Sequence, residues 1–260
     1  MHRFQVKPED ISGAVLLLRG TEAHHLTKVL RLGPGEEVLA FDNSGLEYRV
    51  RVEQITQEEV VCAVLERYLP RSEPPLDVFL LQGLPKADKM ELIIQKNTEL
   101  GIRGIFPLRT SRAVVQLEGK KALDRVERWQ KIAAEAAKQC GRSRVPSIAP
   151  IEGLDKALRL LPEGTMLLAA YEGEKVQGLA EELKAWAGGP VGIVIGPEGG
   201  FSTQEIGFLK ENGARSVSLG PRILRTETAG LAALTMVLYQ LGDLGKSNFE
   251  DTATGTETAE

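Results

Sequence analysis

The sequence predicts an α/β protein of two parts, a small β-rich unit followed by a larger unit built on a parallel sheet. Three observations support this prediction. The first ~70 residues contain several short strand patterns and a single helix pattern. A segment with three prolines, residues 69–75, then interrupts the chain and favours an extended linker. From residue 77 onward, strand and helix patterns alternate, which is typical of a parallel sheet with helices on both faces.

The N-terminal unit, residues 1–70, combines four strand patterns with one helix. Strands are predicted over residues 14–18, 37–41, 46–55 and 59–65. Asp42-Asn43-Ser44-Gly45 has the turn chemistry for a hairpin between the middle two strands. Thr21 is a candidate cap for a helix over residues 22–30, which Gly33-Pro34-Gly35 ends. Such a set of elements favours a small barrel or sandwich.

The C-terminal unit, residues 76–246, alternates strands and helices. Strands are predicted over residues 77–82, 102–108, 166–171, 191–195 and 216–220, and helices over 88–101, 124–140, 154–161, 179–186 and 227–241. The last helix is apolar on all sides, so we expect the core to cover one face and a second subunit to cover another. Residues 247–260 are acidic, rich in threonine and without apolar periodicity, which predicts a disordered tail.

Bulk features exclude several classes of protein. No apolar run approaches the ~20 residues that span a bilayer, and the first residues lack the apolar core of a signal peptide. We therefore expect a cytoplasmic protein without membrane contacts. Cys62 and Cys140 are far apart, and the three histidines offer no ligand spacing, so no metal site is predicted.

Charge is unevenly distributed along the chain. The formal net charge of −4 argues against binding nucleic acid over the whole surface. Residues 109–145, however, contain ten Lys or Arg against four Asp or Glu. This stretch is either a phosphate-contacting surface or a solvated helix face with intrahelical ion pairs.

Two loops near the C-terminus carry the most distinctive patterns. Ile195-Gly196-Pro197-Glu198-Gly199-Gly200-Phe201-Ser202 follows an apolar strand and leads into a Ser-x-x-Glu capping box. Leu219-Gly220-Pro221-Arg222-Ile223-Leu224-Arg225-Thr226 also joins a strand to a helix. In an open parallel sheet ligands lie outside the carboxyl ends of the strands, so the two loops predict one shared pocket. Neither loop matches the glycine patterns that bind nucleoside triphosphates or nicotinamide cofactors, and the chain has no Gly-x-Ser-x-Gly nucleophile motif.

These loops and two upstream motifs resemble one known family. The upstream motifs are Leu84-Pro85-Lys86-Ala87-Asp88-Lys89-Met90-Glu91 and Gln95-Lys96 with Thr98-Glu99-Leu100-Gly101. In this order the four motifs resemble the ribosomal RNA small subunit methyltransferase E family of SPOUT methyltransferases, and the resemblance extends from Arg3 to about Leu244. The chain departs from the pattern at two turns, with Ala87 where a glycine is common and Asn43 in place of a glycine.

The resemblance implies a specific fold and function. It implies a PUA-like β-barrel for RNA binding, a SPOUT-type parallel α/β domain with a deep trefoil knot, and a homodimer. The implied reaction is S-adenosylmethionine-dependent methylation of uridine N3 in 16S rRNA of the small ribosomal subunit. A non-catalytic RNA-binding or ribosome assembly factor with the same fold is the alternative.

The resemblance and the residue chemistry together predict three groups of site residues. Glu198 is a candidate base or a helix-dipole partner, and Arg222 and Arg225 are candidate cations beside the substrate or plain surface charges. The predicted cofactor-binding residues are Leu168, Ala170, Gly196, Pro197, Glu198, Gly199, Gly200, Leu219, Gly220, Ile223, Leu224, Thr226, Thr228 and Ala229. The predicted RNA-binding residues are Arg3, Lys28, Arg31, Lys86, Lys89, Arg112, Arg142 and Arg144.

Overall fold

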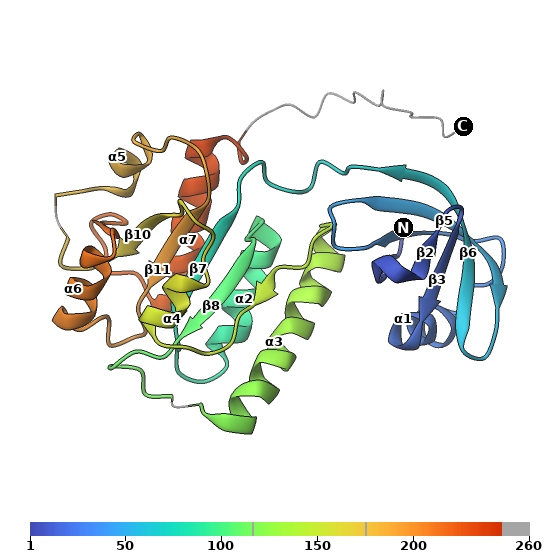
Figure 1. The fold of residues 1–260 in the computed structure, drawn as a ribbon, viewed down its shortest axis with the longest axis horizontal. Coiled ribbons are helices and arrows are strands. Elements are labelled where there is room, and N and C mark those ends of the chain that lie inside the picture. The colour runs from blue at the N-terminus through green and yellow to red at the C-terminus, as the bar shows by residue number, and fades with distance from the viewer. Residues whose placement is uncertain (116, 175, 246–260) are drawn as a thin grey trace.

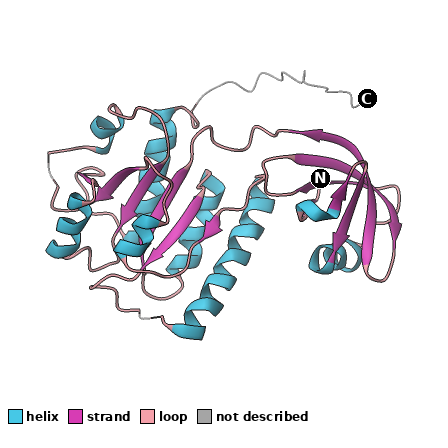
Figure 2. Cartoon of the chain, in the orientation of Figure 1, coloured by secondary structure: helices cyan, strands magenta, loops and turns pink. Residues whose placement is uncertain are grey.

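The computed structural model describes residues 1–115, 117–174 and 176–245, and within these ranges it contains two six-stranded sheets (Figures 1 and 2). The sheet of the N-terminal part lies beside the larger C-terminal part (Figure 1). No helix in the described ranges has the length and apolar character to cross a membrane. The predicted disordered tail, residues 247–260, lies outside the described residues.

The N-terminal sheet has the strand order β1-β4-β5-β6-β3-β2. Its strands are β1 (Arg3–Gln5), β2 (Ile11–Ser12), β3 (Val15–Arg19), β4 (Glu37–Phe41), β5 (Glu47–Ile55) and β6 (Glu59–Tyr68). Neighbours pair antiparallel except β1, which runs parallel to β4. The four predicted strands and the β4–β5 hairpin are confirmed, whereas β1 and β2 are too short for the alternation to be recognised.

The helical segment of this part differs from the prediction. Helix α1 spans Gly20–His24 and continues as a π-helical turn over His25–Val29. Arg19 occupies the cap position without a side-chain bond, so the prediction that Thr21 caps the helix is wrong. The wider π turn buries Leu26 and places the His25 ring edge-on to Phe4, with 5.8 Å between ring centroids.

The C-terminal sheet has the order β12-β10-β11-β7-β8-β9, and every pair in it is parallel. Its strands are β7 (Val78–Gly83), β8 (Gly104–Leu108), β9 (Ser147–Ile148), β10 (Met166–Ala170), β11 (Val191–Ile195) and β12 (Arg215–Val217). The parallel sheet predicted from the alternation of strands and helices is therefore confirmed. Strand β9 was not predicted because its two residues carry no periodicity.

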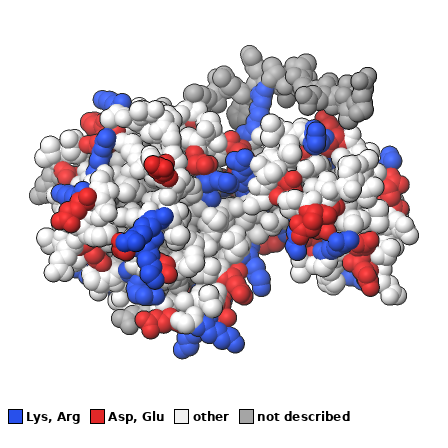
Figure 3. Space-filling model, in the orientation of Figure 1, with Lys and Arg blue, Asp and Glu red and all other residues white. Residues whose placement is uncertain are grey.

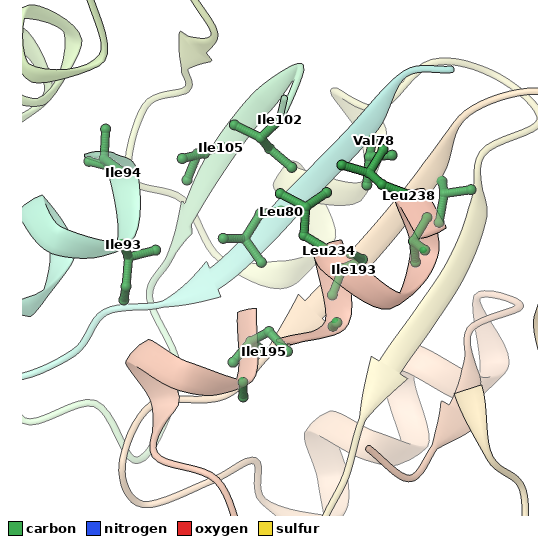
Figure 4. Close-up of a cluster of buried hydrophobic side chains, with 14 of the residues drawn as sticks. Val78, Leu80, Ile93, Ile94, Ile102, Ile105, Ile193, Ile195, Leu234 and Leu238 are labelled. Atoms are coloured by element: carbon green, nitrogen blue, oxygen red, sulfur yellow. The ribbon is translucent and has the colours of Figure 1, made fainter. Parts of the chain in front are cut away.

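Helices cover both faces of this sheet. Side chains alternate along β7, so Val78 and Leu80 pack into one apolar cluster while Phe79 and Leu81 pack into another. The helices on the first face are α2 (Lys89–Leu100), α3 (Gly119–Cys140), α5 (Leu179–Leu183) and α7 (Thr226–Leu241). Those on the second face are α4 (Leu154–Arg159) and α6 (Thr203–Glu211). Figure 4 shows Leu234 and Leu238 of α7 beside the strands on the first face.

The two parts of the chain are joined by side-chain and backbone contacts. Phe41, at the end of β4, is fully buried in the core of the C-terminal part. The turn after it also docks there, because Asn43 Oδ1 accepts a hydrogen bond from the Val145 amide at 2.5 Å. Ser143 Oγ donates to the Gly45 carbonyl at 3.2 Å. The β4–β5 turn is therefore part of the junction between the sheets.

Candidate functional site

A pocket of about 790 Å³ lies at the carboxyl ends of β10, β11 and β12. Its walls are the segments that follow these strands, together with Lys89 at the start of α2 and Ala229 of α7. A pocket of this size, outside the carboxyl ends of parallel strands, is the expected position and volume for a small-molecule site. The two loops that the sequence singled out therefore do share one pocket.

The glycines of the β11–α6 loop allow its backbone to pack closely. A Cβ on Gly196 would lie 3.2 Å from the Gly200 backbone, and Gly200 itself turns with φ +65°. Gly83, at the end of β7, is needed for the same reason, because a Cβ there would lie 2.5 Å from the Pro197 ring. These glycines thus serve the turn of the loop itself and its contact with β7.

A hydrogen-bonded chain holds this loop against the start of α7. The Thr226 hydroxyl donates to the Gly196 carbonyl at 2.6 Å and accepts from Gln82 Nε2 at 2.8 Å. Gln82 is fully buried at the end of β7. Gln82 was not among the predicted site residues, although a lone amide at the end of an apolar strand is a recognisable signal of a buried polar contact.

The carboxylate of Glu198 is held by Lys89 and by the Lys86 backbone. Lys89 Nζ lies 2.9 Å from Glu198 Oε1, and the Lys86 amide donates to the two carboxylate oxygens at 3.2 and 3.3 Å. Partial burial acts to raise the pKa of Glu198, but the hydrogen bonds from Lys89 and the backbone outweigh it and leave the pKa below its usual value. A carboxylate in this state is a weak proton acceptor.

Glu205 connects helix α6 to the loop that follows β8. Its carboxylate accepts from the Ser202 amide at 2.8 Å, and the Ser202 hydroxyl accepts from the Glu205 amide, which is the predicted capping box. The same carboxylate accepts from the Ser111 amide at 2.7 Å and from the Ser111 hydroxyl at 3.0 Å. Burial acts to raise the pKa of Glu205, and these bonds lower it overall.

Most of the predicted cofactor-binding residues line the pocket. They are Ala170, Gly196, Pro197, Glu198, Gly200, Leu219, Gly220, Ile223, Leu224, Thr226 and Ala229. Leu168 is fully buried in the core, Thr228 is exposed on α7, and the Gly199 carbonyl accepts from Arg112, so these three lie outside the lining.

The pocket also has lining residues that were not among the predicted cofactor-binding residues. They come from the segment after β10, from the base of the second loop and from the end of the first: Tyr171, Glu172, Glu174, Ile195, Phe201, Val217, Ser218 and Pro221. Together with Glu198, three carboxylates therefore line the same space as the apolar side chains and the backbone groups. This combination suits a ligand that has both apolar surface and positive charge.

The two candidate cations Arg222 and Arg225 are exposed and line the pocket. Ile223 lies between them and is 84% exposed. The three side chains thus belong to the part of the pocket that opens to solvent, where a large substrate has access.

The predicted RNA-binding residues fall into two groups. Lys28, Arg31 and Lys86 are exposed, and so is Arg112, which also donates to the Gly199 carbonyl at 3.1 Å. The remainder have partners within the chain. Lys89 binds Glu198, Arg3 pairs with Glu47, Arg144 donates to the Ser44 carbonyl at 2.9 Å, and Arg142 is 3% exposed in an ion pair with Glu73. A buried guanidinium with these partners has no face left for a phosphate, so Arg142 is a structural residue.

Both parts of the chain match known families of RNA methyltransferases. Residues 72–238 match the RNA methyltransferase domain, and residues 18–65 match the RNA methyltransferase PUA domain. Ribosomal RNA small subunit methyltransferase E of Bacillus subtilis (strain 168) is 38% identical over 228 residues, which cover 86% of this chain and 89% of that protein. The protein of the same name from Mycobacterium bovis is 34% identical over 239 residues, 90% of each chain.

A solved structure supports the same relationship. Ribosomal RNA small subunit methyltransferase E from Neisseria gonorrhoeae, bound to S-adenosyl methionine, superposes with a TM-score of 0.81 and 33% identity. The match covers 92% of this chain and 97% of that chain. A PUA domain followed by a methyltransferase domain on a parallel sheet is the fold class that the sequence predicts.

Proposed function

Because the chain belongs to the RNA methyltransferase family that includes ribosomal RNA small subunit methyltransferase E, we propose that it methylates 16S rRNA of the small ribosomal subunit with S-adenosylmethionine. The observation that carries this proposal is the pocket formed by the two glycine-containing loops at the carboxyl ends of β10, β11 and β12. The named relatives and the cofactor-bound structure have the same architecture over nearly their whole length.

The pocket residues fit this cofactor. Apolar side chains such as Phe201, Leu219 and Leu224 offer a surface for an adenine ring, and loop backbone groups offer hydrogen bonds for its edge. Glu172 and Glu174 place negative charge where a ligand with a sulfonium and an ammonium group would be held. When bound, S-adenosylmethionine supplies a methyl group on a good leaving group, so the protein mainly has to align and desolvate the reactants.

We further propose that the methylated atom is N3 of a uridine. N3 of uracil carries a proton, and its loss leaves negative charge shared with the two carbonyl oxygens, O2 and O4. Arg222 and Arg225 are exposed at the mouth of the pocket and can stabilise that charge or hold the adjacent phosphates. Glu198 is held by Lys89 with a lowered pKa, so we assign it an anchoring role and not that of the proton acceptor.

We propose that the RNA-binding surface consists of those predicted basic residues that are exposed. Lys28 and Arg31 in the N-terminal part, and Lys86 and Arg112 beside the pocket, are available to phosphates. On the face drawn in Figure 3, basic and acidic side chains are interspersed over both parts of the molecule. Binding by a few well-placed cations fits this distribution better than binding by one continuous basic face.

The remaining features implied by the resemblance belong to the same proposal. We divide the chain into an RNA-binding unit, residues 1–70, and a methyltransferase unit, residues 76–246. We carry the trefoil knot over from the family resemblance. The homodimer is supported by the partly exposed apolar residues of α7, Leu231, Met236 and Tyr239, and a concentration-independent monomer mass would exclude it. We expect the enzyme to act in the cytoplasm.

Methyl transfer to ribosomal subunits tests the proposal. The full chain is incubated with labelled S-adenosylmethionine and with small subunits purified from cells that lack this modification. We expect label in 16S rRNA and none in large subunits treated in the same way. Absence of label from both, with a folded protein, would overturn the proposed activity.

A further inference from the structure

Lys89 connects three segments that are distant in the sequence. It is the first residue of α2, and its Nζ lies 2.9 Å from Glu198 Oε1 and 3.2 Å from Glu227 Oε2. Glu198 belongs to the β11–α6 loop, and Glu227 belongs to the first turn of α7. The side chain of Lys89 is 27% exposed and lines the pocket.

The two carboxylates belong to the two walls of the pocket. Glu198 belongs to the loop that forms one wall, and Glu227 follows directly after the Leu219–Thr226 segment that forms the other. Without a cation between them, the two negative charges would repel each other and push the walls apart. The Lys86 amide adds a second tie from the start of α2 to Glu198.

The surrounding charges agree with this arrangement. The hydrogen bonds to Glu198 and then Glu227 raise the pKa of Lys89. The pKa of Glu227 is lowered first by its own backbone amide at the helix start and also by Lys89 and Arg225, against partial burial. Glu172 and Glu174 also line the pocket, so loss of Lys89 would remove a positive charge from a site that already contains several carboxylates.

We propose that Lys89 is a positioning residue that holds the two walls of the pocket at the separation that S-adenosylmethionine binding requires. This inference rests on the proposed function, because it assigns the cofactor to this pocket. Lys89 acts through Glu198 and Glu227, and its role is to fix the walls before the cofactor binds. Preorganised walls improve affinity because less ordering remains for the ligand to impose.

Replacing Lys89 therefore has an effect that depends on charge. At about pH 7, Lys89→Met weakens S-adenosylmethionine binding by about tenfold, in line with the loss of charge-assisted hydrogen bonds. With the cation gone, the pKa values of Glu198 and Glu227 rise. Lowering the pH to about 5.5 then protonates part of the pair, and the difference in affinity between Lys89→Met and the wild type becomes smaller. Adding Glu198→Gln to Lys89→Met removes one negative charge, so the double variant should recover part of the lost affinity for S-adenosylmethionine at both pH values. Lys89→Arg keeps the cation and retains most of the affinity.

Calorimetric titration of the full chain with S-adenosylmethionine at both pH values tests the inference. Lys156→Met is the matched control, because Lys156 pairs with Glu152 on the far side of the sheet and is 70% exposed. Thermal melting of each variant checks that it is folded. The positioning role of Lys89 is supported if Lys89→Met binds S-adenosylmethionine more weakly than the wild type and if both Glu198→Gln and low pH reduce this loss of affinity. The positioning role is overturned, and the proposed function is left intact, if Lys89→Met binds with wild-type affinity. The same conclusion follows if neither Glu198→Gln nor low pH reduces its loss of affinity. A folded wild-type protein that does not bind S-adenosylmethionine overturns both the positioning role of Lys89 and the proposed function.

Discussion

At the scale of single residues, two departures from the family pattern lie in the same unusual backbone conformation. Ala87 has φ +54° and Asn43 has φ +68°, both in the left-handed region. Asparagine tolerates this region, and Asn43 also uses its side chain to bind the Val145 amide. Alanine has no such compensation, so Ala87 carries strain in the turn that leads to Lys89.

Ala87→Gly should therefore stabilise the protein. Relief of the left-handed strain outweighs the added backbone entropy, and we expect the free energy of unfolding to rise by about 0.5–1 kcal/mol. Ala157→Gly, in the interior of α4, is the comparison and should lower the free energy of unfolding by more than about 1 kcal/mol, because Ala157 is also buried in the core. Denaturant titration of both variants gives the measurement. A loss of stability in Ala87→Gly would show that the turn is not strained.

The role of Glu198 can be separated from that of a catalytic base by the pH dependence of the reaction. Glu198 is already ionised and bound to Lys89, so Glu198→Gln should lower the methylation rate without changing the shape of the pH–rate profile. The profile is measured with small subunits as substrate, between about pH 5 and 9. If the substitution removes an ionisation from the profile, Glu198 is the base and the anchoring role is wrong.

At the scale of elements, helix α6 and the loop after β8 are coupled through one carboxylate. Glu205 closes the capping box with Ser202 and also binds Ser111. Glu205→Ala should lower the free energy of unfolding by about 2 kcal/mol at neutral pH, because several hydrogen bonds to a charged group are lost. Ser218→Ala, which removes a hydroxyl contact with the Gly220 backbone, is the comparison and should have a smaller effect on the free energy of unfolding.

The contribution of Glu205 to the free energy of unfolding should also depend on pH. Its pKa is lower in the folded protein than the reference value of 4.5, so its contribution is complete above that value and is lost as the pH falls through the folded pKa. The difference between wild type and Glu205→Ala should consequently shrink between about pH 5 and 3. Unfolding curves of wild type and Glu205→Ala at several pH values measure this difference in the free energy of unfolding. A difference that stays constant over this range would mean that the carboxylate charge is not what stabilises the cap.

The sequence predicted elements best where the pattern was long or the capping chemistry explicit. Residues 37–41 and 191–195 are strands with the predicted bounds, and the Ser202 capping box has both of its bonds. Short strands such as β1 and β9, and the π turn over His25–Val29, depend on tertiary contacts that no local pattern encodes. The same distinction applies to the site. Loop motifs located the pocket, whereas the partner of Gln82, the position of Tyr171 and the ion pair of Lys89 became apparent only once distant segments were placed together.

At the scale of the whole molecule, the orientation of the two parts depends on a buried ion pair. The Arg142 guanidinium donates to Glu73 at 2.8 Å and to the carbonyls of Thr98 and Ile102 at 3.1 and 2.8 Å. Glu73, in the linker between the sheets, also accepts from the amides of Ser143 and Arg144. The linker and the turn of the N-terminal part thus meet the same segment, residues 142–145.

Arg142→Ala should destabilise the protein because it removes the charged partner of Glu73 and the guanidinium that donates to two buried carbonyls. We expect a loss of about 3 kcal/mol in the free energy of unfolding. Trp129 and Trp186, the two tryptophans of the chain, both lie in the C-terminal part and report its unfolding by fluorescence. Arg159→Ala removes a surface pair whose side chains are 77% and 58% exposed, and should cost less than about 1 kcal/mol. Equal effects of the two substitutions would contradict the structural role of Arg142.

We propose that the pocket formed by the two loops directs methyl transfer to one uridine of 16S rRNA. Mass mapping of rRNA nucleotides tests it most directly, after small subunits lacking the modification are incubated with the protein and labelled S-adenosylmethionine. We predict a single methyl group on N3 of one uridine in 16S rRNA, and a strong reduction with Arg225→Ala. Methyl groups on a different nucleotide or atom, or none from a folded, cofactor-binding protein, would contradict the account.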